Sequence, residues 1–209
     1  MVRQMGHRVM KALSGRIFLA LCAGLLWIAP AQGAMQRYEV DVDHSTLEFS
    51  VAHMVVSKTT GRFTDYTGFI EMDPEALKAN AIEAVIKTAS ITTNHAKRDE
   101  HLRGPDFFNV EQYPTMIYRM KSYQKTGEDY TVVGDLTLLG VTKEIVLVGR
   151  FNGVAKDPWG NERAGFTAAG KLNRKDFGMN WSKTLDNGGL VVGNEVGIRM
   201  EIECIKAKK

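Results

Sequence analysis

Residues 130–151 read YTVVGDLTLLGVTKEIVLVGRF, and this stretch decides the fold. Between Tyr130 and Leu138 every second residue is apolar or glycine, and threonine and aspartate occur among the residues in between. After a break at Leu139-Gly140, the alternation returns from Ile145 to Phe151. A period of two is typical of a strand with one buried face. A glycine turn between two such runs predicts an antiparallel hairpin.

The same alternation continues in both directions along the chain. Its other runs are Leu47–His53, Ile82–Ile86, Met116–Met120, Ala164–Leu172 and Val196–Cys204, with a further segment around Phe63–Met72. Together they predict an all-β protein of about eight antiparallel strands. Such strands form either a sandwich or a barrel, and their spacing alone does not choose between the two. Strands of eight or nine residues would each span roughly 27–30 Å.

One or two short helices are expected between the strands. Asp73 is a good N-cap residue, and Pro74 suits the first helical position of a segment that runs to Lys78. Residues 94–103 form the second candidate, between two strands.

The N-terminus has the pattern of a secretory signal peptide. Four basic residues (Arg3, Arg8, Lys11, Arg16) precede an apolar run of 13 residues from Ile17 to Ala29, and no acidic residue occurs before Glu39. The run is shorter than the ~20 residues that span a bilayer, which favours a cleaved segment over a retained membrane anchor, the alternative reading. We therefore predict cleavage between Ala31 and Ala34, with residues 1–33 removed and residues 34–209 forming one domain.

Removal of this segment changes the charge and the cysteine content. The chain has 209 residues, with 27 Lys and Arg against 24 Asp and Glu. Without the four basic residues of the N-terminal segment, 23 basic residues face 24 acidic ones, a formal charge of −1. No basic stripe remains for nucleic acid. Cys22 leaves with the segment, and Cys204, on the apolar side of the last strand, is expected to be an inert buried thiol.

No strong catalytic motif is present, and we expect no cofactor and no metal. His95, Asp99 and His101 fall within seven residues. The two histidines are six apart, which is neither the spacing of one helix face nor a compact zinc spacing, so capping and loop hydrogen bonds are favoured over metal ligation. His53 ends an apolar strand face, either as a core histidine or at a pocket mouth.

The inward-facing positions mix large and small side chains. Phe49, Phe63, Tyr118 and Phe166 alternate along the chain with alanines and glycines such as Gly134. An eight-stranded barrel is wide enough either to be filled by its own side chains or to hold one slim ligand, and both readings stay open. Arg98, Arg103, Arg174 and Lys175 are candidates for holding a pyrophosphate, although solvated charge is the simpler reading.

Seven segments together resemble one family across about 160 residues. They are 38–53, 61–70, 90–93, 98–102, 106–114, 134–142 and 172–178, and they include HSTLEFSVAH at 44–53, DFFN at 106–109 and LNRKDFG at 172–178. In this order and spacing the chain resembles the YceI-like polyisoprenoid-binding proteins. It departs from many members in having Tyr38 in place of Trp and Asn109 in place of Asp.

The resemblance implies a lipocalin-like, eight-stranded antiparallel barrel in the bacterial periplasm. It implies a tunnel that carries a polyprenyl, quinone-like or fatty-acyl lipid as cargo, without catalysis. From the alternation we predict that the tunnel is lined by Leu47, Phe49, Val51, His53, Phe63, Ile82, Ile86, Met116, Tyr118, Leu136, Phe166, Leu172, Ile198 and Met200, with Phe107 and Phe108 as a lid.

Two other classes of function remain as alternatives. One is an enzyme that acts on a lipid and uses His53, Asp99 or His101 as acid and base. The other is a stress-related structural module with a filled barrel. As partners we expect a lipid, transient contact with a membrane and a homodimer, and no nucleic acid.

Overall fold

The computed structural model describes residues 34–54, 56–184 and 189–208, mostly as β-strands. The predicted signal peptide lies outside the described residues. The strands are β1 (Gln36–Val40), β2 (Thr46–His53), β3 (Ser57–Phe63), β4 (Tyr66–Asp73), β5 (Lys78–Lys87), β6 (Ile91–Thr92), β7 (Thr115–Thr126), β8 (Asp129–Leu138), β9 (Val141–Lys156), β10 (Glu162–Asn173) and β11 (Val192–Lys206).

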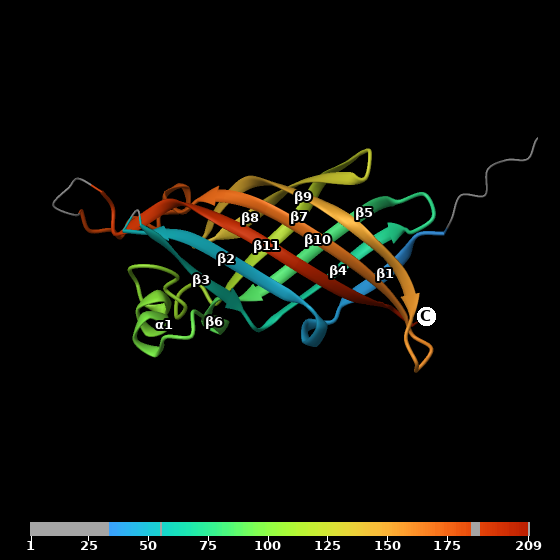
Figure 1. The fold of residues 1–209 in the computed structure, drawn as a ribbon, viewed down its shortest axis with the longest axis horizontal. Helices are drawn as coiled ribbons and strands as arrows, with labels where there is room; N and C mark the ends of the chain where they lie inside the picture. The colour runs from blue at the N-terminus through green and yellow to red at the C-terminus, as the bar shows by residue number, and fades with distance from the viewer. Residues whose placement is uncertain (1–33, 55, 185–188, 209) are drawn as a thin grey trace, which may run out of the picture. The chain divides into compact units, whose positions relative to one another are not determined.

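The strands close into a ring (Figure 1). Hydrogen-bonded neighbours run β1-β4-β5-β7-β8-β9-β10-β11, and β1 pairs again with β11, all antiparallel. Tyr38 lies opposite Lys206 on one side of β1 and opposite Ile70 on the other. A closed ring has no free edge, so the sheet is a barrel and not a sandwich. The predicted fold, an eight-stranded antiparallel barrel, is confirmed.

Three of the eight positions around the barrel are each filled by two successive strands. β1 and β2 both pair with β11, and the 3₁₀ turn η1 (Val42–His44) separates them. β3 pairs with β2 while β4 pairs with β1, and β6 pairs with β3 while β5 pairs with β4. The single strand expected around Phe63–Met72 is therefore the end of β3 followed by β4. Eleven strands thus make an eight-stranded barrel.

Several strands are longer than the eight or nine residues predicted. β9 has 16 residues and β11 has 15. Strands in a barrel tilt and coil around its axis, and bulges let them bend without ending. The register shifts between Gly165 and Phe166 against β9, and between Val192 and Val196 against β2. Alternation read in short windows stops at such shifts, which is why the sequence underestimated the lengths.

One α-helix is present among the described residues. α1 (Ala96–Arg103) lies at one end of the barrel beside β6, within the predicted segment 94–103 (Figure 1). Arg103 donates to the backbone carbonyls of Ala89 and Ile91 at 2.8 and 2.7 Å, which ties the helix to the barrel wall. Among the residues described, no helix is long and apolar enough to cross a membrane.

The helix predicted at Pro74–Lys78 is wrong. Residues 74–77 form a turn between β4 and β5. Asp73 does accept hydrogen bonds from the backbone N–H groups of Glu75 and Ala76, as a helix cap would. Leu77, however, has a φ of +51°, which reverses the chain and lets β5 start at Lys78. The capping signal was real, but the following residues pair as a hairpin.

Candidate functional site

The barrel encloses an apolar cavity of about 310 Å³, measured as the space open to the centre of a water molecule. Every one of the eight positions around the barrel contributes to its wall. Near α1 the wall contains Val51 and Leu172, which are opposite Val196 on its two sides. Toward the other end, where the β4–β5 turn lies, it contains Met72 and Ala79. The barrel is therefore hollow along its length.

Nearly all of the predicted lining residues lie on this wall. They are Leu47, Phe49, Val51, Phe63, Ile82, Ile86, Phe107, Phe108, Met116, Tyr118, Leu136, Phe166, Leu172, Ile198 and Met200. Those on strands are in phase because the inward face of a barrel strand repeats every second residue, whereas Phe107 and Phe108 come from the segment after α1. Whether these side chains contact a ligand stays a prediction.

His53 is the exception. It is the last residue of β2, half-buried, and it is not part of the cavity wall. It pairs with Val192 beyond the bulge in β11, whereas Val51 pairs with Val196 before it. Val192 still lies on the wall, so the cavity reaches this end of the barrel but not the His53 side chain, and whether His53 contacts a ligand stays a prediction.

Other wall residues were not in the predicted list. Some follow the alternation, such as Val132, Leu147 and Phe151, and a complete count of each inward face would have included them. Others come from connecting segments: Leu102 from α1, and Met179 from the segment after the 3₁₀ turn η3 (Arg174–Phe177). Periodicity carries no signal for those residues.

Aromatic side chains line the cavity near α1. The Phe108 ring meets Phe63 edge-on, with centroids 5.5 Å apart. Phe107 is buried and packs against His101 and Trp181 at centroid distances of 5.0 and 5.3 Å. Both phenylalanines follow α1 and lie on the wall, and their role as a lid stays a prediction.

The proposed acid and base residues have structural partners. Asp99 is buried and accepts hydrogen bonds from the Thr93 backbone N–H at 2.8 Å and from the Thr92 hydroxyl at 3.0 Å. Burial alone raises the pKa of Asp99, but the bonds from Thr93 and Thr92 outweigh it and hold the pKa below its usual value.

The two histidines near Asp99 have other contacts. His95 caps α1 by accepting from the backbone N–H of Arg98, and His101 bonds the Asp106 carboxylate at 2.8 Å. The structure thus uses His95, Asp99 and His101 to hold the helix and its loop, each through a different partner.

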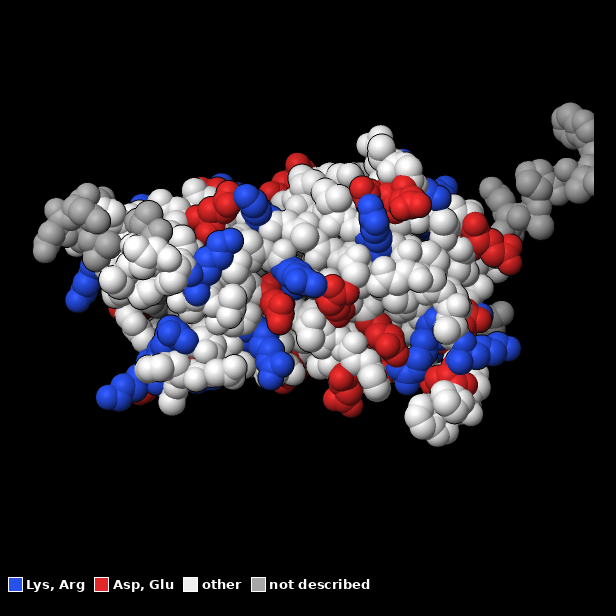
Figure 2. All heavy atoms as spheres, in the orientation of Figure 1, with Lys and Arg blue, Asp and Glu red and all other residues white. Residues whose placement is uncertain are grey.

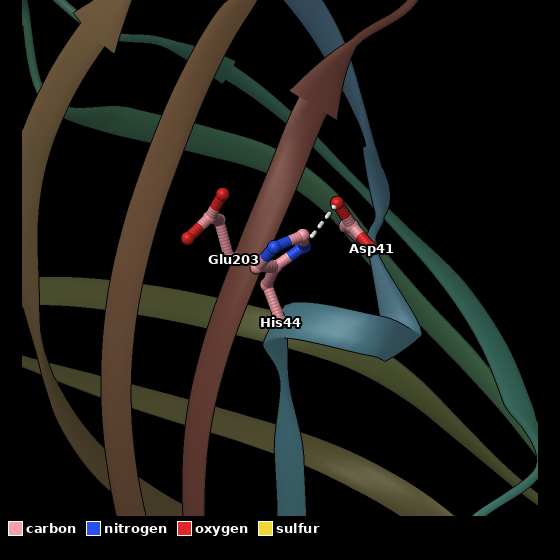
Figure 3. Close-up of side chains that lie close together, drawn as sticks. All are labelled: Asp41, His44 and Glu203. Atoms are coloured by element: carbon pink, nitrogen blue, oxygen red, sulfur yellow. Dashed lines mark hydrogen bonds and ion pairs between the residues drawn. The ribbon is translucent and has the colours of Figure 1, made fainter. Parts of the chain in front are cut away.

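A different trio lies close together, Asp41, His44 and Glu203 (Figure 3). Among the described residues it is the one group of this kind whose ligand-type atoms all lie within 4.8 Å of one another. The Arg163 guanidinium already bonds the Asp41 carboxylate at 2.7 Å and also contacts Glu203 and Asp157. The positive charge of Arg163 thus balances these carboxylates. We assign the group a structural role in joining the end of β1 to β10 and β11.

The basic candidates for a pyrophosphate site are largely engaged. Arg98 donates to Thr93 through its side chain, and Arg103 bonds two backbone carbonyls near β6. Arg174 is buried and donates to the carbonyls of Met179 and Gly193 at 2.5 and 2.8 Å. Lys175 is exposed. The structure does not gather these four into one anion site.

The charge distribution on the surface and the burial of Cys204 agree with the predictions made from the sequence. Figure 2 shows acidic and basic side chains interspersed on the visible face of the barrel, with no stripe of one sign. Cys204 is fully buried, and burial raises the pKa of its thiol to about 12, with further contributions from Glu39, Asp41 and Glu203. A thiol of this kind stays protonated at neutral pH and behaves as a small apolar side chain.

A hollow, eight-stranded antiparallel barrel with an apolar lumen belongs to the class of β-barrels built to enclose a ligand. Residues 38–204 match the model of the YceI-like domain, and the chain belongs to that family. A UPF0312 protein of Photorhabdus laumondii is 41% identical over 164 residues, which cover 78% of this chain and 85% of the relative.

Two solved structures have folds similar to that of this chain. The YceI protein of Campylobacter jejuni is 34% identical, with a TM-score of 0.65 over 75% of this chain and 90% of that one. A polyisoprenoid binding domain from Saccharophagus degradans is 16% identical, with a TM-score of 0.60 over 83% of this chain and 100% of that one. At that identity, the second likeness shows the fold alone.

Proposed function

We propose that this chain binds one long, slim lipid of the isoprenoid or fatty-acyl type inside its barrel and carries it without converting it. The observation that carries this proposal is the apolar cavity of about 310 Å³ that continues from the α1 end toward the β4–β5 turn. The chain belongs to the YceI-like family, and its fold is also that of a polyisoprenoid binding domain, so a barrel of this fold is able to hold this class of ligand.

The energetics of such a cavity favour a chain-shaped ligand. Each buried methylene-sized group contributes about 0.8 kcal/mol, so about twenty of them contribute about 16 kcal/mol. Ordering costs of about 8 kcal/mol would leave about 8 kcal/mol, which corresponds to a Kd near 1 μM. A compact polar metabolite would gain little from this wall and would lose its hydration.

Two observations favour a lipid carrier over a lipid-acting enzyme and over a structural module with a filled barrel. Of the residues suggested for acid–base chemistry, Asp99 bonds the Thr93 backbone and His101 bonds Asp106, both in α1 and its loop, while His53 lies at the end of β2 and off the cavity wall. The hollow lumen argues against a structural module with a filled barrel.

We further propose that the protein acts in the periplasm after removal of residues 1–33. Support comes from the basic segment and apolar run at the N-terminus. Cell fractionation followed by N-terminal sequencing checks this: a mature protein that starts between residues 32 and 35 in the periplasmic fraction is expected, and a full-length chain in the cytoplasm would refute it.

Mass spectrometry of lipids extracted from the native protein tests the binding proposal. The Phe166 ring lies on the wall against Phe151, with centroids 5.3 Å apart. Phe166→Glu places a charge in the lumen and should abolish lipid co-purification, whereas Phe166→Leu should retain it. Val148→Glu, on the exposed outer face of β9, is the matched control and should also retain lipid. A folded Phe166→Glu protein with its full lipid content would refute the proposal.

A further inference from the structure

Two aliphatic side chains are exposed at the tip of the β2–β3 hairpin. Val56 is 83% exposed and Met54 is 42% exposed. The tip lies at the α1 end of the barrel (Figure 1). Single exposed apolar side chains are ordinary on protein surfaces, so the surroundings of these two decide whether they have a role.

The backbone of the tip holds these side chains in place. The Met54 N–H donates to the Val191 carbonyl at 3.0 Å, and the Val56 N–H donates to the His53 carbonyl at 3.2 Å. Met54 also has a φ of +52°, in the left-handed region that residues with a side chain rarely adopt. Glycine or asparagine would suit this backbone better, so an apolar side chain stands here against the local preference.

Two lysines flank the tip. Lys58 follows on β3 and is exposed. Lys183 is exposed too, and its carbonyl accepts from the N–H of Val191, the residue whose own carbonyl accepts from Met54. Neither lysine forms an ion pair with any residue that the structure describes. From residue 49 to residue 64 the chain has no acidic residue. The tip thus combines exposed aliphatic groups with unpaired positive charge.

The tip also lies next to the cavity. Val191 bonds the tip, and Val192, the next residue, lines the cavity and is opposite His53. A partner that docks on the tip is therefore held beside the cavity wall.

The opposite end of the barrel differs in this respect. Trp159, in the β9–β10 turn, is 80% exposed. The cavity wall ends at Phe151 on β9 and begins again at Phe166 on β10, so the turn that carries Trp159 extends well beyond it. An exposed apolar side chain and the cavity are adjacent at the α1 end and separated at this one.

The size and charge of the tip fit a bilayer surface better than a protein. A stable protein interface buries roughly 800 Å² on each partner, and two aliphatic side chains do not supply that area. Reversible attachment to an anionic bilayer needs less. Aliphatic groups enter the interfacial region of the lipids, and lysines beside them meet the phosphate groups.

We propose that Met54, Val56, Lys58 and Lys183, here called the apical patch, dock the barrel on the surface of an anionic phospholipid bilayer. The α1 end of the barrel then faces the membrane. The proposal rests on the carrier function above, because it names the surface across which lipid passes between bilayer and cavity. The attachment is reversible, since it uses two apolar side chains and two charges.

Flotation with lipid vesicles tests the docking. The vesicles consist of phosphatidylcholine alone or of phosphatidylcholine mixed with phosphatidylglycerol, and wild type should bind the mixed vesicles more tightly. Val56→Ser should weaken binding to the mixed vesicles about tenfold, and Lys58→Gln about fivefold. High salt should remove the effect of Lys58→Gln and leave most of the effect of Val56→Ser, because salt screens only the charges.

Two further variants at the tip keep the test independent of folding. Met54→Asn removes an apolar group and suits a φ of +52°, so it should weaken vesicle binding without lowering the melting temperature. Val56→Trp should strengthen binding, because tryptophan favours the bilayer interface. All variants carry the same N-terminal segment, so differences between them report the apical patch.

Trp159→Ser is the matched control. It removes a larger exposed apolar side chain from the opposite end of the barrel. Its turn stays held, because the backbone N–H of residue 159 donates to the Asp157 carboxylate at 3.0 Å whatever the side chain. This variant should bind vesicles as wild type does.

Failure of the docking and failure of the carrier function give different results. Wild-type affinity for the mixed vesicles in both Val56→Ser and Lys58→Gln, or a loss confined to Trp159→Ser, overturns the docking. A dimer that Val56→Ser dissociates, without vesicle binding by wild type, also overturns it, because the occupant is then a second copy. In these cases, lipid that co-purifies with the protein leaves the carrier function standing. Patch-dependent docking by a protein that holds no lipid overturns the carrier function instead.

Discussion

Narrowing the lumen at one small residue should shorten the lipid that the barrel accepts. Ala168 lies on the cavity wall, and its neighbour Ala169 is exposed on the outer face of the same strand, β10. Ala168→Phe adds a ring to the lumen, and Ala169→Phe adds the same ring to the solvent side. The pair separates an effect on the cavity from a general effect of a phenylalanine in β10.

The expected loss of lipid affinity in Ala168→Phe follows from the sizes of the side chains. The ring adds six carbon atoms, and part of it packs over Gly149, which is opposite Ala168 and carries no side chain. The variant therefore excludes about four methylene-sized groups of the ligand, which at about 0.8 kcal/mol each amounts to about 3 kcal/mol. Affinity for a long chain should fall about 150-fold. Ala168→Leu adds three carbons and should produce roughly half of this free-energy change.

The assay is probe displacement by fatty-acid methyl esters of increasing length. In wild type, affinity should rise about fourfold per methylene until the cavity is full. In Ala168→Phe this rise should end about four carbons earlier, with short esters unaffected, while Ala169→Phe should match wild type. Thermal melting of each lipid-free variant checks that the fold is retained. Equal affinity of wild type and folded Ala168→Phe for the longest esters would refute the reasoning.

The remaining predictions concern the stability of the barrel. Arg174→Met leaves the carbonyls of Met179 and Gly193 without their donor, and the free energy of unfolding in urea should fall by about 3 kcal/mol; a loss below about 0.5 kcal/mol would contradict this role. Hydrogen bonds from Asn161 and Arg163 lower the pKa of Asp157 to about 2 in the folded protein. The folded pKa lies below the unfolded value of about 3.9. The stabilisation that these hydrogen bonds give to the folded protein is therefore complete above about pH 4 and is lost as the pH falls toward 2. The stability difference between wild type and Asp157→Asn should therefore shrink between pH 4 and pH 2, and a difference that stays constant over this range would disprove the assignment.

Much of the cavity wall was predictable because alternation is a property of single strands. Phe49, Tyr118 and Met200 each sit in a regular run, and the structure places all three on the wall. The helix predicted at Pro74–Lys78 is wrong, because Leu77 has a positive φ that reverses the chain and lets β5 pair with β4. The capping signal at Asp73 describes only the first turn and does not record which strand the following residues pair with. His53 lies off the wall, and its contact with a ligand stays a prediction.

By itself, the sequence determined the inward and outward faces, the antiparallel hairpins and the family, because these depend on residues close together along the chain. Only the tertiary structure decided that the sheet closes through β1 and β11, since that contact joins residues from opposite ends of the described chain. It also decided that the lumen is open, and that Arg174 is engaged by backbone carbonyls. Packing across a closed barrel depends on all eight strands at once, so no local pattern records whether its centre is filled.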